Sequence, residues 1–285
     1  MPHGIDHLVL AVRDLERARD TYRRLGFTLT PEARHPFGTK NSLVQLDDQF
    51  LEIVAIGDEA AIPAATDSFF SFAAFNRDFV AAREGLSMLA LRSDDTFVTH
   101  AELATAGLRT YDPVPFERIA RGPDGSERKV AFTMDFVSDP RMADAAFFTC
   151  QHHYPENFWR LDFQRHANGA RSVESVIMVA DDPAARGGFL VAFSGADAHL
   201  TTPDGVFIDT GRGRIELLTP AAAGAVLGGR VEGGAARFVA CRIGTGDLSK
   251  TAAVLREGGV GVAERGRFLV VPPQEALGVA LIFSE

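Results

Sequence analysis

A unit of one strand, one helix and three further strands recurs four times along these 285 residues, and this repeat limits the fold more than any other feature. In the first copy, the apolar run over residues 5–12 predicts a buried strand. Asp14 then predicts the start of a helix and Gly26 its end, with further strands expected at residues 27–30, 42–46 and 49–56. Each copy spans roughly 50 to 70 residues, a period typical of internal duplication.

The later copies open near residues 86, 172 and 238. A single unit is an open sheet with an uncovered apolar face, so the units are expected to pair. The sequence therefore predicts an α+β protein of four βαβββ modules that are paired into two domains. The first domain is expected to cover residues 1–158 and the second residues 168–285, with residues 159–167 as the linker.

The bulk composition restricts the class of protein and its partners. The formal net charge of -9 argues against nucleic acid or an anionic membrane surface as the main partner. Two cysteines, Cys150 and Cys241, cannot form a disulfide framework and are typical of a reducing compartment. No signal-peptide pattern and no apolar stretch of membrane-spanning length appears, so we expect a cytoplasmic protein that acts on a small molecule.

Phenylalanines gather between the first two copies. Phe72, Phe75 and Phe79 lie at helical spacing, which predicts a connecting helix whose apolar stripe packs on the core. The alternative interpretation is that some of these rings, Phe72 among them, form the wall of an apolar ligand pocket.

The opening segment, Ile-Asp-His-Leu-Val-Leu-Ala-Val-Arg-Asp-Leu at residues 5–15, resembles the first strand and helix start of the vicinal oxygen chelate (VOC) superfamily. Its closest likeness is to the glyoxalase-like domain proteins of the glyoxalase, bleomycin-resistance and dioxygenase group. Further matching residues are His35, Gly38, Thr39, Asn41 and the segment 50–52. The resemblance implies two glyoxalase-like domains whose curled mixed sheets form a cleft with a divalent metal. Because the superfamily includes isomerases, lyases, dioxygenases and antibiotic-binding proteins, it narrows the fold and site more than the reaction.

In the resembled family, metal ligands come from the first and last strands of two paired modules. The corresponding first-strand residues of the first domain are His7 and Met88, and the last-strand residues are Glu52 and Gln151. Since a register slip of one residue exchanges Gln151 for His152, both stay open as ligands beside His7 and Glu52. Imidazole, carboxylate and amide donors suit Mn, Fe, Co, Ni or Zn.

The same comparison distinguishes the second domain from the first. Its corresponding residues are Ser175, Phe238, Glu216 and Ile282. This set lacks an imidazole, so we expect the second domain to be degenerate and without a metal.

Six residues are predicted to contact the substrate. His35, Thr39 and Asn41 could donate hydrogen bonds to a bound carbonyl, or could simply build a turn. Arg118, Arg121 and Arg128 could clamp an acidic substrate, or could belong to a solvated loop. The predicted substrate-contacting residues are His35, Thr39, Asn41, Phe72, Met88 and Arg121.

The resemblance and the residues together favour a metal-dependent enzyme that acts on a small carbonyl or vicinal-oxygen substrate. It would be an isomerase, a lyase or a related proton-transfer enzyme, with His7 and Glu52 as catalytic residues. The alternative is a metal-free binding protein of the bleomycin-resistance type, suggested by Met88 at a ligand position. An extradiol dioxygenase is less favoured, because iron oxygenases generally need a second histidine. A homodimer is a further hypothesis.

Overall fold

The computed structural model describes residues 3–122 and 125–285, so the first two residues of the predicted first domain lie outside it. The elements of the first repeat are β1 (Ile5–Ala11), α1 (Leu15–Arg24), β2 (Ala33–Arg34), β3 (Thr39–Gln45) and β4 (Phe50–Ile56). The Asp14 carboxylate accepts the Arg17 backbone N–H at the start of α1, and Gly26 follows the helix at a φ of 85°. Both predicted helix ends are therefore confirmed.

The strand predicted over residues 27–30 is wrong. The Phe27 ring is buried beside Tyr22, and the Thr28 backbone N–H donates to the His166 ring instead of to a neighbouring strand. The short strand β2 follows a few residues later. A buried aromatic ring and a β-branched residue made this loop look like a strand.

The second repeat follows a connecting helix, α2 (Phe72–Ala82), as its helical spacing predicted. The Ser71 hydroxyl accepts the Ala74 backbone N–H and so begins this helix. The second repeat contains β5 (Gly85–Ser93), α3 (Thr96–Thr105), β6 (Arg109–Thr110), β7 (Val114–Arg121), β8 (Glu127–Ser138) and β9 (Ala146–His152). A short helix, α4 (Pro155–Phe158), leads into the predicted linker.

The last two repeats share the same plan. The third contains β10 (Ala170–Val179), α5 (Ala184–Ser194), β11 (His199–Thr202), β12 (Gly205–Asp209) and β13 (Arg214–Leu218), and is followed by α6 (Pro220–Leu227). The fourth contains β14 (Arg237–Thr245), α7 (Leu248–Glu257), β15 (Ala263–Arg265), β16 (Phe268–Val271) and β17 (Ala280–Ser284).

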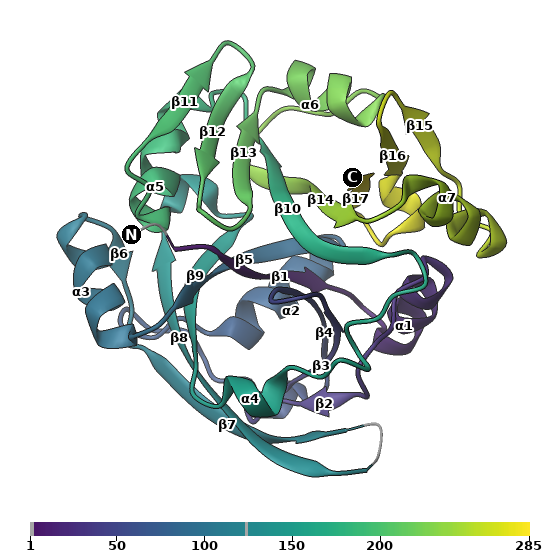
Figure 1. Ribbon diagram of the computed structural model, residues 1–285. Helices are drawn as coiled ribbons and strands as arrows, with labels where there is room; N and C mark the ends of the chain where they lie inside the picture. The colour runs from purple at the N-terminus through teal and green to yellow at the C-terminus, as the bar shows by residue number, and fades with distance from the viewer. Residues whose placement is uncertain (1–2, 123–124) are drawn as a thin grey trace.

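Two mixed sheets form from these strands (Figure 1). The nine-stranded sheet follows the order β2-β3-β4-β1-β5-β9-β8-β6, with β7 paired to β8, and the eight-stranded sheet the order β11-β12-β13-β10-β14-β17-β16-β15. The first strands of consecutive repeats pair antiparallel, β1 with β5 and β10 with β14. The protein is thus α+β with paired βαβββ modules, as predicted, and within the described residues neither sheet closes into a barrel.

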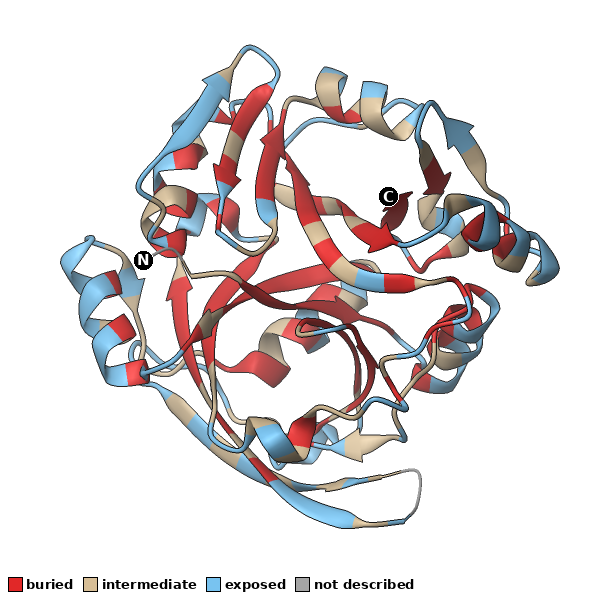
Figure 2. Cartoon of the chain, in the orientation of Figure 1, coloured by how far each residue is buried: buried red, intermediate tan, exposed pale blue. Residues whose placement is uncertain are grey.

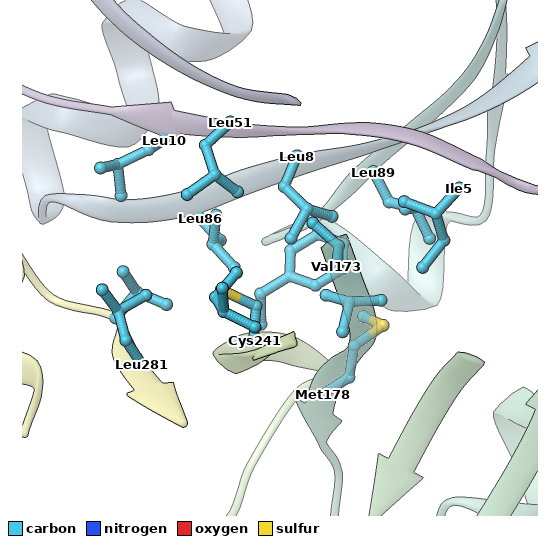
Figure 3. Packing of buried hydrophobic residues seen from close by; sticks show 14 of the residues in the cluster. Ile5, Leu8, Leu10, Leu51, Leu86, Leu89, Val173, Met178, Cys241 and Leu281 are labelled. Carbon is cyan, nitrogen blue, oxygen red and sulfur yellow. The ribbon is translucent and has the colours of Figure 1, made fainter. Parts of the chain in front are cut away.

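One apolar core lies between the two sheets. Leu8 and Leu10 of β1 project toward the second sheet, whose Met178 and Cys241 belong to the same core, as Figure 3 shows. The central strands are accordingly buried along most of their length, as Figure 2 shows. The two predicted domains are therefore packed through a shared core, while their boundaries stay a prediction.

The opposite face of the first sheet carries a second, aromatic cluster. Because side chains alternate along a strand, His7 and Val9 point to this face while Leu8 and Leu10 enter the shared core. This aromatic face contains the candidate site. No helix in the described ranges combines the length and the apolar character needed to cross a membrane.

Candidate functional site

A β-bulge at the start of β1 creates the central pair of side chains. Ile5 pairs with Leu91 of β5, but His7 pairs with the adjacent Ala90, so Asp6 is an extra residue in the ladder. The bulge brings the Asp6 and His7 side chains together despite their adjacency in the sequence. The His7 Nδ1 donates to Asp6 Oδ1 over 2.6 Å, and both residues are buried.

Asp6 accepts a second imidazole on the same oxygen. The His152 Nε2 of β9 donates to Asp6 Oδ1 over 3.1 Å. Burial by itself would raise the pKa of Asp6, but the charges and hydrogen bonds of His152 and His7 outweigh it and hold that pKa well below its usual range. Asp6 is therefore a carboxylate, and its hydrogen bond leaves Nε2 as the free ring nitrogen of His7.

Glu52 of β4 lies on the other side of the His7 ring. The Asn41 amide Nδ2 donates to Glu52 Oε1 over 2.6 Å and also approaches His35 Nε2 at 3.3 Å. With Nε2 accepting, the His35 Nδ1 donates to the Thr39 hydroxyl over 2.8 Å. Burial, followed by the nearby charge of Arg118, lowers the pKa of His35 to about 3, so this imidazole stays neutral.

The free atoms of the two central residues face each other. His7 Nε2 and Glu52 Oε2 are 3.8 Å apart. Since Asp6 holds the Nδ1 hydrogen, both facing atoms are acceptors unless the imidazole carries a second proton. The Asn41 Oδ1 is a further buried acceptor without a donor among the described residues. The polar end of this site therefore suits a cation or a proton.

A narrow cavity of about 30 Å³ opens beside these atoms. The His7 ring stacks on Phe50 with centroids 4.2 Å apart. The other apolar walls are formed mostly by aromatic rings, namely Phe37, Phe72, Phe116, Phe132, Phe148 and Phe158. Phe72 thus supports the pocket interpretation at one position, while Phe75 and Phe79 of the same helix do not line the cavity.

Cys150 of β9 also faces this cavity. Asp6, His7 and Cys150 each offer a metal-ligand atom, and these atoms lie within 4.8 Å of one another. Burial raises the pKa of the Cys150 thiol, and the charges of Asp6 and Glu52 raise it further. The thiol is therefore protonated at neutral pH unless a metal displaces its proton.

The structure does not bring Gln151 to His7. The Gln151 Oε1 accepts the backbone N–H and the hydroxyl of Thr96, and its Nε2 donates to the Asp94 carbonyl. Because successive residues of β9 point to opposite faces, Cys150 and His152 face the site and Gln151 faces α3. Cys150 and Gln151 therefore point to opposite faces of β9, and the His152 register is the observed one.

The remaining predicted residues are placed as follows. His35 and Asn41 line the cavity, and Thr39 holds the His35 ring from behind. Met88 is fully buried, with its sulfur 3.9 Å from the Asn76 amide, and does not line the cavity. Arg121 lies in a larger neighbouring cleft, where it pairs with Glu127.

The second sheet has a different set at the corresponding positions. Glu216 lies 3.9 Å from the Arg242 guanidinium. Ser175 is buried nearby, while Phe238 belongs to the shared core and Ile282 to the apolar cluster of the second sheet. The Glu216 carboxylate therefore already has a positive counter-charge, the Arg242 guanidinium.

The sequence interpretation missed Asp6 and Cys150, and it named Arg118 only as one of three arginines that could clamp an acidic substrate. Asp6 meets His7 only because of the bulge, and no local signal marks a bulge here. Arg118 occurs on β7, where intermediate and exposed residues alternate, and this period of two could have indicated that it faces inward.

The sequence comparison agrees with this fold. The model of the glyoxalase-like domain family matches residues 5–192, more than half of the chain. The chain belongs to this family, within the VOC superfamily. No curated protein matches the sequence.

Solved structures share the fold at low sequence identity. A hypothetical protein from Staphylococcus aureus superposes with a TM-score of 0.69 at 12% identity, covering 99% of this chain and 98% of that one. A variant of 4-hydroxymandelate synthase from Streptomyces coelicolor gives a TM-score of 0.58 at 13% identity, covering 99% and 92%. A fusion of a xylose isomerase-like TIM barrel with 4-hydroxyphenylpyruvate dioxygenase gives 0.59 at 15% identity, covering 99% of this chain but 49% of that one. These likenesses concern the fold.

Proposed function

We propose that this protein is a metal-dependent VOC enzyme that moves a proton next to the carbonyl of a small substrate. The observation that carries the proposal is the 3.8 Å approach of two acceptors, His7 Nε2 and Glu52 Oε2, in a buried cavity. Bonds of about 2.0–2.2 Å from a Zn-like ion to nitrogen and oxygen allow one ion to join atoms this far apart. An imidazole and a carboxylate suit Mn, Fe, Co, Ni or Zn.

The other candidate arrangement, with Asp6, His7 and Cys150 as ligands, is less favourable. The 2.6 Å between Asp6 Oδ1 and His7 Nδ1 is a hydrogen-bond distance, shorter than two ligands of one ion normally keep. In many metal sites, one ring nitrogen of a histidine binds the metal and the other donates a hydrogen bond to a carboxylate that is not itself a ligand. We therefore assign Asp6 as the residue that orients His7.

The protein residues have distinct tasks in this mechanism. A divalent ion bound by His7 and Glu52 would polarise a substrate carbonyl oxygen and lower the pKa of the neighbouring C–H. Asn41 fixes the Glu52 carboxylate through Oε1 and leaves Oε2 facing His7, where it would hold the ion. The Glu52 carboxylate would accept the proton when its oxygen is not bound to the ion. The surrounding phenylalanine rings exclude water, which strengthens the electrostatic interactions inside the cavity.

Metal binding tests the proposal, and the duplicated fold offers a matched control. Glu52 and Glu216 occupy corresponding strands of the two sheets, so Glu52→Gln and Glu216→Gln remove the same charge from each. Titration of the full chain with Mn²⁺, Co²⁺ or Zn²⁺ should give one ion per chain in the wild type and in E216Q. E52Q and His7→Ala should lose at least about tenfold in affinity. The proposal fails if the wild type takes up no ion or if E52Q binds it unchanged.

A second candidate function is metal-free binding of an apolar small molecule. It is supported by the aromatic walls of the cavity, and by Met88, which takes the place of a ligand on the first strand of the second module and does not line the cavity. If His7→Ala retains full affinity for the ligand and the wild type binds no metal, the binding function is the correct one.

A further inference from the structure

A wide cleft of about 470 Å³ adjoins the aromatic cavity, between residues 30–34, the end of β3 and the strands β7 and β8. Among the described residues of its lining, five are arginines and two are acidic. The charged residues are Arg34, Arg118, Arg121, Arg128, Arg160, Glu32 and Glu127. A cleft lined mainly by one sign of charge raises the local concentration of the opposite ion.

Arg118 lies where the cleft and the cavity meet, because it lines both of them together with Leu43 and Phe158. Within the described residues, its guanidinium makes no hydrogen bond or ion pair, and its Nε is completely buried without an acceptor. Burial lowers the pKa of Arg118, although the charge of Glu52 acts in the opposite direction. A buried cation without a partner is costly, so the position favours an anionic ligand.

Other arginines of the cleft differ from Arg118 in this respect. Arg34 is 3.3 Å from Glu32, and Arg121 is 3.0 Å from Glu127. Both pairs are largely exposed at the rim, where ion pairs contribute little. Arg118 differs from both, because it lies at the mouth of the aromatic cavity and no carboxylate pairs with it among the described residues.

We infer that the ligand of this protein is an organic anion, a carboxylate or a phosphate monoester, whose charged group binds Arg118 while its neutral end enters the aromatic cavity. Guanidinium groups bind both kinds of anion through paired hydrogen bonds. The inference rests on the proposed function in one respect only, namely that the reacting carbonyl belongs to the neutral end of the ligand. The size of the cleft leaves room for a group larger than the anion itself on its outer side.

Binding of simple probes to the full chain tests this inference. Benzoate and phenyl phosphate present the two anions on the same ring, and benzyl alcohol is their neutral counterpart. Trp159, the single tryptophan, has its ring centroid 4.9 Å from that of Phe158 at the mouth and should report binding by fluorescence. We expect at least one anion to bind about tenfold tighter than benzyl alcohol. No preference for either anion would overturn the inference, and the better of the two identifies the charged group.

Variants of Arg118 and of a control arginine test where the anion binds. Arg118→Gln should weaken the preferred anion about tenfold and leave benzyl alcohol unchanged, whereas Arg256→Gln, a paired arginine on α7, should have no effect. Unchanged anion binding in R118Q overturns the inference. So does a strong loss of folding stability in R118Q, because that would make Arg118 a structural residue. His7→Ala should keep the affinity for the preferred anion. The anion measurement can therefore be interpreted even if the metal proposal fails. Loss of the anion in H7A but not in R118Q would place it at His7 instead.

Discussion

His7 donates its Nδ1 hydrogen to Asp6 Oδ1 over 2.6 Å, although the two residues are neighbours on one strand. The bulge between Ile5 and His7 makes this contact, and His152 donates to the same oxygen from β9. The orientation of the His7 imidazole thus depends on a backbone irregularity as well as on a side chain. Two consequences can be measured.

Asp6→Asn should weaken metal binding at His7 by about 10- to 100-fold, because the amide cannot hold the Nδ1 hydrogen as a carboxylate does. Isothermal titration with Zn²⁺ measures the change. Asp135→Asn is the control, since Asp135 is another fully buried aspartate that pairs with a histidine, His100, at 2.9 Å outside this site. Equal affinities in wild type and D6N would remove Asp6 from the site.

Cobalt distinguishes the two candidate ligand arrangements. If His7 and Glu52 hold the ion while the Cys150 thiol keeps its proton, the Co²⁺ protein should lack a thiolate charge-transfer band in the near ultraviolet. Cys150→Ser should then bind Co²⁺ within about threefold of the wild type. A charge-transfer band that disappears in C150S would instead establish Cys150 as a ligand. Cys241→Ser, a buried thiol between the sheets, is the control.

Much of the architecture was predictable because its signals are local. The apolar run of β1, the Asp14 cap and the fourfold period are all readable along the chain, and they led to paired modules. The same alignment of modules brought His7 and Glu52 to one place, where their facing atoms are 3.8 Å apart.

The predictions that failed concern the face of the sheet to which a side chain points. That face depends on the pairing between strands that are distant in the sequence. On β9, a shift of one residue decides whether Gln151 or Cys150 enters the cavity, and nothing local fixes that register. Asp6 was missed for a related reason, because a bulge interrupts the alternation. That Arg118 faces the cavity became clear only once β7 was paired with β8.

Phe72→Ala should enlarge the cavity and change its preference for ligand size. The Phe72 ring is buried between Phe37 and Phe148, at centroid distances of 5.7 and 6.4 Å. Removing it should lower the free energy of unfolding by about 3 kcal/mol and favour 2-naphthol over phenol by about tenfold relative to wild type. Phe79→Ala, on the same helix but away from the cavity, should lose stability without gaining this preference. Fluorescence titration measures the ratio, and equal ratios in both variants would remove Phe72 from the cavity wall.

His166 should make the protein less stable as the pH falls through the ordinary range of histidine. The Thr28 backbone N–H donates to His166 Nδ1 over 3.0 Å, and His166 Nε2 donates to the Gln45 carbonyl over 2.7 Å. Both ring nitrogens are thus used by the neutral form, and burial lowers the pKa of His166 despite the hydrogen bond to Gln45.

Because the pKa of His166 is lower in the folded state, the unfolded chain binds a proton at a pH at which the native His166 is still neutral. The contribution of His166 is therefore fully present above the unfolded pKa of about 6.5 and decreases below it, by at most about 1.4 kcal/mol per pH unit. Urea unfolding of wild type and His166→Gln between pH 8 and pH 5 should show the wild-type advantage shrinking as the pH falls. His199→Gln removes an exposed histidine of β11 and should show a smaller change with pH. A wild-type advantage over H166Q that grows toward low pH would mean that the buried ring is protonated in the native protein.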